Sequence, residues 1–144
     1  MVRQALHRRA LKRGAAVMAR EGVPGTPVRV LLVEDNEILR STTAEYLREI
    51  GYEVEGCANG SEALARADEA RFDVLMTDID LPGMSGLELV NTLRRVQPAV
   101  GAVIVSGYVH LLGDNVPPDT LVLAKPFDMR TLDQLLRKAA ARRA

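Results

Sequence analysis

Cysteine is nearly absent from this chain of 144 residues, which contains Cys57 alone. A single cysteine excludes an intramolecular disulfide framework and fits a reducing compartment, so we expect a cytoplasmic protein in which Cys57 is a small buried hydrophobe. Long apolar runs are also missing, so we expect no membrane span. The apolar stretch 14–19 is too short, and too soon followed by Arg20, to be a secretory signal.

Net charge is absent as well, because 19 basic and 19 acidic side chains cancel. Charge therefore gives no indication of nucleic acid binding. A chain of this length suits one domain with one core, and it leaves no room for a second full-sized domain such as a DNA-binding output domain. Any output must then come from this domain or from a partner.

Basic residues are concentrated at the start of the chain. Residues 1–27 carry six basic side chains and one acidic one, a balance of +5, whereas the remainder carries 13 basic and 18 acidic ones, a balance of −5. We expect residues 1–27 to be a disordered basic extension that ends in a flexible linker over 21–27, and residues 28–144 to form the globular domain. The alternative for the extension is a basic amphipathic helix that docks on an acidic partner, a membrane or nucleic acid.

From Val28 onward, short β-branched runs alternate with longer segments of helical spacing, which is the pattern of βαβ units around a parallel sheet. The expected strands span 28–33, 52–58, 73–78, 99–107 and 120–125. The expected helices span 36–51, 59–72, 85–98 and 128–144. Residues 108–119 are rich in breakers, so we expect only a turn or two at 109–112 and hence a shortened fourth helix.

Polar side chains stand at the carboxyl ends of four predicted strands. They are Glu34 and Asp35 after the first strand, Asp78 at the end of the third, Ser106 at the fourth and Lys125 at the fifth. In open parallel α/β sheets, ligands bind at the carboxyl ends of the strands, near the point where the strand order reverses. Each residue taken alone has an ordinary explanation as a helix start, a turn or a surface charge. Their joint placement at one edge predicts a site.

Three carboxylates at one edge would repel one another unless a cation neutralises them. A hard divalent cation with carboxylate, carbonyl and water ligands is the usual solution, and Mg²⁺ is the natural candidate. No histidine or cysteine stands at these strand ends, so zinc is not expected. A carboxylate beside a divalent cation, a lysine and a hydroxyl suits the acceptance of a phosphoryl group, and Asp78 on the predicted central strand fits the nucleophile best.

These segments resemble the receiver domain of two-component response regulators. "LLVEDNE", "TDIDLPGMSGLEL", "VIVSGY" and "LAKPFD" occur in the order typical of that family, and the resemblance extends from Val28 to about Arg143. One such segment would be a weak signal, but the four together are specific. The resemblance implies a doubly wound, five-stranded parallel sheet with the flavodoxin-like strand order 2-1-3-4-5.

The resemblance also implies roles for the acidic residues. Asp78 is the phosphoacceptor, and Asp35 and Asp78 are side-chain ligands of Mg²⁺. Glu34 acts on the metal through water, and Asp80 acts through its backbone carbonyl.

Other roles implied by the resemblance concern the phosphoryl group itself. Ser106 and Lys125 contact it, and the Lys125-Pro126 bond is cis. Asp80 and Tyr108 match the variable positions that tune dephosphorylation in the family. One position departs from the family: Val122 stands where many receivers carry a tyrosine or phenylalanine. We therefore expect the phosphorylated state to be sensed through another surface, with loop 107–119 as an order–disorder element.

Three functions remain open at this point. The first is a stand-alone receiver that takes a phosphoryl group from a histidine kinase or histidine phosphotransfer protein and signals to an unidentified protein target. Such a protein catalyses only its own phosphorylation and dephosphorylation. The second is a phosphorylation-independent receiver-like adaptor. The third is a metal-dependent phosphate-ester hydrolase with Asp80 as a second acid, which the Leu81-Pro82-Gly83 turn and the lysine of "LAKPFD" argue against.

Overall fold

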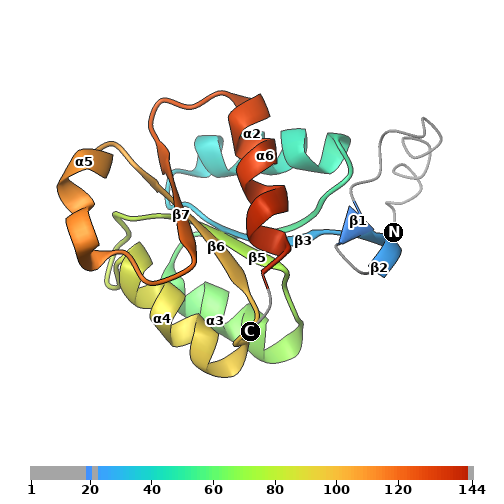
Figure 1. Ribbon diagram of the computed structural model, residues 1–144, viewed down its shortest axis with the longest axis horizontal. Helices are drawn as coiled ribbons and strands as arrows, with labels where there is room; N and C mark the ends of the chain where they lie inside the picture. The colour runs from blue at the N-terminus through green and yellow to red at the C-terminus, as the bar shows by residue number, and fades with distance from the viewer. Residues whose placement is uncertain (1–18, 21–22, 143–144) are drawn as a thin grey trace.

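The computed structural model describes residues 19–20 and 23–142. Its main sheet consists of five parallel strands (Figure 1). In chain order these are β3 (Arg29–Val33), β4 (Glu53–Cys57), β5 (Val74–Asp78), β6 (Gly101–Ser106) and β7 (Thr120–Ala124). Their spatial order, β4-β3-β5-β6-β7, confirms the predicted order 2-1-3-4-5 and makes β5 the central strand.

The four longer helices cover the two faces of the sheet (Figure 1). α2 (Glu37–Glu49) and α6 (Met129–Ala140) lie on one face, and α3 (Gly60–Glu69) and α4 (Gly86–Val96) lie on the other. Each helix follows a polar side chain that accepts a hydrogen bond from the backbone amide three residues later; these caps are Asn36, Asn59, Ser85 and Asp128. Because the first turn of a helix leaves amides unpaired, such caps favour a helix start at these positions.

Side-chain alternation along the strands divides the core into two clusters. Val30 and Leu32 of β3 pack in the cluster beneath α2 and α6, whereas Leu31 and Val33 pack in the cluster beneath α3 and α4. All four side chains are at most 2% exposed. β3 is therefore buried on both faces, as its nearly continuous apolar run predicts.

The fourth helix of the domain is short, as predicted. α5 (Val109–Leu112) has four residues and is followed by a single 3₁₀ turn, η2 (Gly113–Asn115). Val122 of the neighbouring strand β7 is only half-buried. Within residues 19–20 and 23–142, no helix combines the length and the apolar character needed to cross a membrane.

The segment before the main sheet differs from the expected linker. Val23–Pro27 forms a strand, β2, that pairs antiparallel with Ala19–Arg20, β1, in a separate two-stranded sheet. Two strands this short are too brief to show an alternating pattern from which to predict them. Residues 1–18 lie outside the described residues, and the expected disordered extension stays a prediction there.

Candidate functional site

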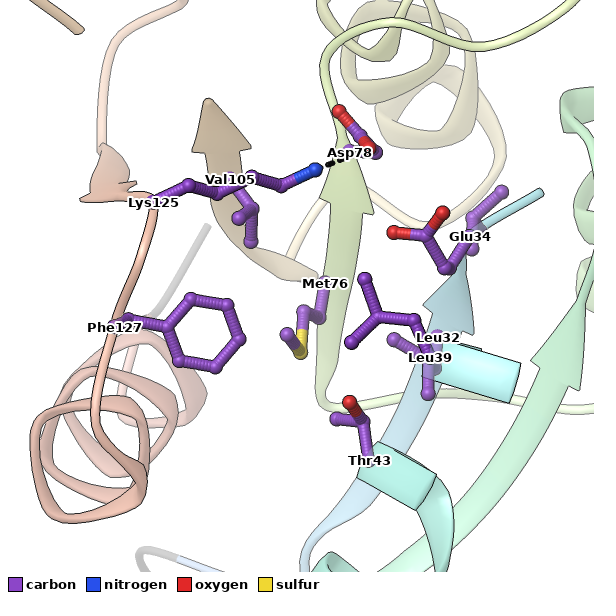
Figure 2. A pocket seen from close by; sticks show the side chains of 10 residues that line it. Leu32, Glu34, Leu39, Thr43, Met76, Asp78, Val105, Lys125 and Phe127 are labelled. Atoms are coloured by element: carbon purple, nitrogen blue, oxygen red, sulfur yellow. Dashed lines mark hydrogen bonds and ion pairs between the residues drawn. The ribbon is translucent and has the colours of Figure 1, made fainter. Parts of the chain in front are cut away.

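The carboxyl edge of the sheet brings acidic side chains from two neighbouring strands together. Glu34 and Asp35 follow β3, and Asp78 ends β5, which pairs with β3. Each residue offers one carboxylate oxygen, and these three oxygens lie within 4.8 Å of one another. Figure 2 shows the Glu34 and Asp78 carboxylates beside the Lys125 ammonium, which enters from the end of β7.

Asp78 is held by one partner at each carboxylate oxygen. Lys125 Nζ donates to Oδ2 at 2.8 Å, and the Asp80 amide donates to Oδ1 at 3.1 Å. The Asp78 side chain is 9% exposed, so most of its charge is balanced by protein groups rather than by water. Partial burial lowers the pKa of Lys125, but its hydrogen bond to Asp78 and the nearby carboxylates outweigh this and raise the pKa overall. Lys125 is therefore a stable cation in the site.

Glu34 is as buried as Asp78. Burial raises the pKa of Glu34, the hydrogen bond from the Asn36 amide to Oε2 lowers it, and the negative charge of Asp78 raises it again, with a net rise. On the main chain, Arg40 Nη1 of α2 donates to the Glu34 carbonyl at 2.8 Å. This contact fixes the loop that carries the acid pair, and local sequence patterns do not reveal it.

Ser106 lies at the end of β6 and is 1% exposed. Its hydroxyl oxygen accepts a hydrogen bond from the Tyr108 amide at 2.8 Å, and its carbonyl accepts one from the Lys125 amide at 2.9 Å. Asp78 of β5 pairs with Val105 of β6. Ser106 is the next residue of β6, so it lies one position beyond the neighbour of Asp78. The structure thus places the predicted hydroxyl and ammonium on adjacent strand ends.

Asp80 is exposed, and its amide is the group that contacts Asp78. The chain then turns outward through Leu81-Pro82-Gly83, with Gly83 at a φ of +84°, a conformation that favours glycine. The metal contact expected from the Asp80 carbonyl stays a prediction. The Lys125-Pro126 bond is cis, which confirms the expectation from the resemblance.

A small, partly open hollow lies beside these residues (Figure 2). Its charged lining residues are Glu34, Asp78 and Lys125. Its apolar side consists mainly of Leu32, Leu39, Met76, Val105 and Phe127. Phe127 lies in the loop before α6, and Leu39 lies in α2. The sequence analysis did not predict either as a residue of the site, because it considered only the ends of the strands. The phenylalanine of "LAKPFD", two residues after the lysine, is the signal for Phe127.

The donor set fits Mg²⁺. All three clustered groups are carboxylates, which are hard oxygen donors, and no histidine or cysteine belongs to the cluster found in the described part of the chain. A partly exposed group of few ligands suits a cation that keeps several waters and also binds phosphate oxygens. Glu34, Asp35 and Asp78 would therefore hold the ion.

Comparison with known proteins gives consistent matches. The response regulator receiver domain family model matches residues 30–137. The response regulator receiver protein CpdR of Brucella abortus (strain 2308) is 33% identical over 113 residues, which cover 76% of this chain and 94% of that protein. The response regulator receiver protein Anae109_2439 of Anaeromyxobacter sp. (strain Fw109-5) is 46% identical over 81 residues, which cover 56% of this chain and 34% of that protein.

Solved structures show the same fold. The response regulator TrrA of Thermotoga maritima, in complex with Mg²⁺ and BeF, superposes with a TM-score of 0.68 and 28% identity. The match covers 78% of this chain and 98% of TrrA. Among the relatives, the share of their own length that this chain covers varies widely, from nearly all of CpdR to about a third of the Anaeromyxobacter protein.

Proposed function

Because the chain belongs to the response regulator receiver domain family, we propose that it accepts a phosphoryl group on Asp78 with Mg²⁺ and signals to a protein partner. The observation that carries this proposal is the arrangement around Asp78. Two further carboxylates lie within 4.8 Å of it, and an ammonium group lies 2.8 Å from its Oδ2. Carboxylate nucleophile, cation ligands and a positive side chain are the parts that phosphoryl transfer to aspartate requires.

In the proposed reaction, a carboxylate oxygen of Asp78 forms a bond to phosphorus. The bond from phosphorus to the donor atom breaks at the same time, and the donor atom keeps the electron pair. Lys125 would leave the carboxylate and pair with a phosphoryl oxygen. The Ser106 hydroxyl would donate a hydrogen bond to another phosphoryl oxygen. Bound Mg²⁺ would neutralise further negative charge on the phosphoryl oxygens. Glu34, Asp35 and Asp78 would hold the ion, together with the Asp80 carbonyl.

The product of this reaction is an acyl phosphate, which water can hydrolyse. Asp80 lies two residues after Asp78, and Tyr108 lies two residues after Ser106. Both side chains are exposed, so we propose that they tune the access of water to the acyl phosphate. The reaction changes only the protein itself. We therefore regard the chain as a phosphoacceptor that promotes its own phosphorylation and dephosphorylation, without an external substrate.

The proposed donor is a histidine kinase or a histidine phosphotransfer protein, because a phosphorylated imidazole transfers its phosphoryl group readily to a carboxylate. The proposed target is a protein. Because α5 is short and Val122 stands half-buried where many receivers carry an aromatic residue, we propose that this target binds a surface other than the one that the family's aromatic switch controls. A cytoplasmic location is part of the proposal, and the free, buried Cys57 fits a reducing compartment.

The test is intact-mass analysis after incubation with acetyl phosphate, with and without Mg²⁺, on the wild type and Asp78→Asn. We expect one phosphoryl adduct that requires Mg²⁺ and is lost in the variant, which removes the nucleophile at nearly constant shape. Absence of both the adduct and Mg²⁺ binding would favour the adaptor function instead. Turnover of a generic phosphate ester would favour the hydrolase.

A further inference from the structure

Thr77, the residue before the acceptor, carries a buried hydroxyl that the proposed reaction does not use. Its side chain is 0% exposed, and Oγ1 donates to the backbone carbonyl of Asp78 at 2.9 Å. A valine would fill the same position in an apolar environment, and a buried hydroxyl is costly unless it is hydrogen-bonded. The contact of Thr77 with the Asp78 carbonyl is therefore the feature that distinguishes this hydroxyl from an ordinary core group.

The same carbonyl lies directly against the start of α4. A Cβ atom built on Gly86 would lie 2.5 Å from the Asp78 carbonyl oxygen and 3.0 Å from Ile79 Cα, which leaves space only for glycine. The Gly86 amide donates to the Ile79 carbonyl at 2.9 Å, and the Ile79 amide donates to the Val105 carbonyl at 3.0 Å. The 78–79 peptide is thus held by Thr77 at its carbonyl and by β6 at its amide, and α4 holds the carbonyl of the next peptide, 79–80.

The 78–79 peptide precedes the one that carries the Asp80 amide, so its orientation constrains where that amide points. The Asp80 amide, one residue further along, donates to Oδ1 of Asp78 at 3.1 Å. If the 78–79 peptide rotated, that amide would leave the carboxylate, and the carboxylate would lose the partner that sets its orientation. The Asp80 carbonyl, the expected metal ligand on the same short loop, would move as well.

We propose that Thr77 is a positioning residue for the acceptor, acting through the backbone of residues 78–80. Its hydroxyl holds the Asp78 carbonyl, so that the Asp80 amide stays on Oδ1 and the carboxylate keeps one orientation toward the cation and the phosphoryl donor. Gly86 allows α4 to approach this peptide closely, and its amide holds the carbonyl of the peptide that carries the Asp80 amide. The inference rests on the proposed function of Asp78 as phosphoacceptor.

The test compares Thr77→Val, which keeps the shape and loses the hydroxyl, with Thr77→Ser, which keeps the hydroxyl. Val100→Ala serves as the matched control, because Val100 is 2% exposed and precedes the opposite end of β6, so its loss weakens the core without touching the site. For each protein, urea unfolding gives stability, calorimetric titration gives the Mg²⁺ dissociation constant, and acetyl phosphate with intact-mass analysis gives the phosphorylation rate. The ¹H–¹⁵N resonance of the Asp80 amide in metal-free protein reports its hydrogen bond directly.

We expect Thr77→Val to weaken Mg²⁺ binding and to slow phosphorylation, each by about tenfold, because supporting contacts of this kind orient ligands and reacting groups. The Asp80 amide resonance moves upfield in Thr77→Val and returns in Thr77→Ser, which also recovers binding and rate. Val100→Ala loses stability and keeps all three site properties. If Thr77→Val does not fold, Thr77→Ala takes its place in the same comparison.

The inference would be overturned if Thr77→Val kept the wild-type Asp80 resonance and Mg²⁺ affinity and lost only stability. The same holds if Thr77→Ser fails to restore the resonance. Failure of the proposed function is a separate outcome, recognised by a wild type that forms no adduct. The Asp80 resonance still decides the positioning role in that case, because it requires neither metal nor phosphoryl donor.

Discussion

Asp78 illustrates how much of this site depends on single atoms. Its Oδ2 faces Lys125 and its Oδ1 faces the Asp80 amide, so each carboxylate oxygen already has one partner before any ligand arrives. When Oδ2 forms the bond to phosphorus, Lys125 is free to move from it to a phosphoryl oxygen. Lys125 is the mobile partner, because its side chain is 34% exposed and reaches the carboxylate from a separate strand, whereas the Asp80 amide belongs to a braced loop.

The charge of Lys125 leads to a prediction for Lys125→Met. We expect Mg²⁺ to bind more tightly, because repulsion between the ammonium group and the cation is lost. We expect phosphorylation by acetyl phosphate to slow by about tenfold or more, because no ammonium neutralises the phosphoryl oxygens. Calorimetric Mg²⁺ titration and an intact-mass time course measure the two effects.

Lys138→Met is the control, because it removes the same charge from an exposed position near the end of α6. If both variants bind Mg²⁺ and react at the same rate, the effect comes from net charge, and Lys125 has no specific role.

At the scale of elements, close contacts between helices and strands bring the strand ends to their positions. Gly101 is the first residue of β6, and a Cβ there would overlap the backbone carbonyl of Ala139 in α6. α6 can lie flat on the sheet only because that position has no side chain. The contact is at the amino end of β6, far along the strand from Ser106, so it concerns stability rather than the site.

Gly101→Ala is therefore expected to lower the free energy of unfolding by about 1–3 kcal/mol, because overpacking forces the helix away from the strand. Gly107→Ala is the matched control, since nothing lies within 4 Å of the Cβ position at Gly107. Urea unfolding of both variants measures the difference. Equal stability of the two variants would mean that α6 moves aside without cost.

At the scale of the whole molecule, the sheet and its two core clusters place one buried thiol where it is protected from water. Cys57 is 1% exposed in the cluster beneath α3 and α4, and burial raises its pKa from 9.0 to about 11. Between these values, the unfolded chain has released the thiol proton and the folded chain still holds it. Unfolding then releases a proton, so stability falls as pH rises.

We expect this thiol to cost roughly 2–3 kcal/mol of stability between about pH 9 and pH 11, and nothing further above that range. Urea unfolding at a series of pH values on the wild type and Cys57→Ala measures the effect as the difference between two curves. Burial also raises the pKa of Tyr52, but that contribution is common to both proteins and cancels. Parallel curves for the two proteins would contradict the prediction.

Sequence alone determined the order of elements from β3 onward, the short fourth helix and the residues at the strand ends. Alternation along strands, helical spacing and side-chain caps such as Asn36 and Ser85 act over a few residues, so local sequence encodes them. The gathering of Glu34, Asp35 and Asp78 followed from one further rule, that parallel strands present their carboxyl ends at the same edge. Their roles, with those of Ser106 and Lys125, stay a proposal.

Tertiary structure alone decided which distant groups meet. The Arg40 contact with the Glu34 carbonyl, the approach of Gly86 to Asp78, and that of Gly101 to α6 all depend on how closely two elements pack. The distance between two packed elements depends on all the side chains that lie between them, so no short segment of sequence encodes it. The hydroxyl of Thr77 marks this boundary, because its sequence position beside Asp78 was evident, whereas its hydrogen-bond partner required the folded chain.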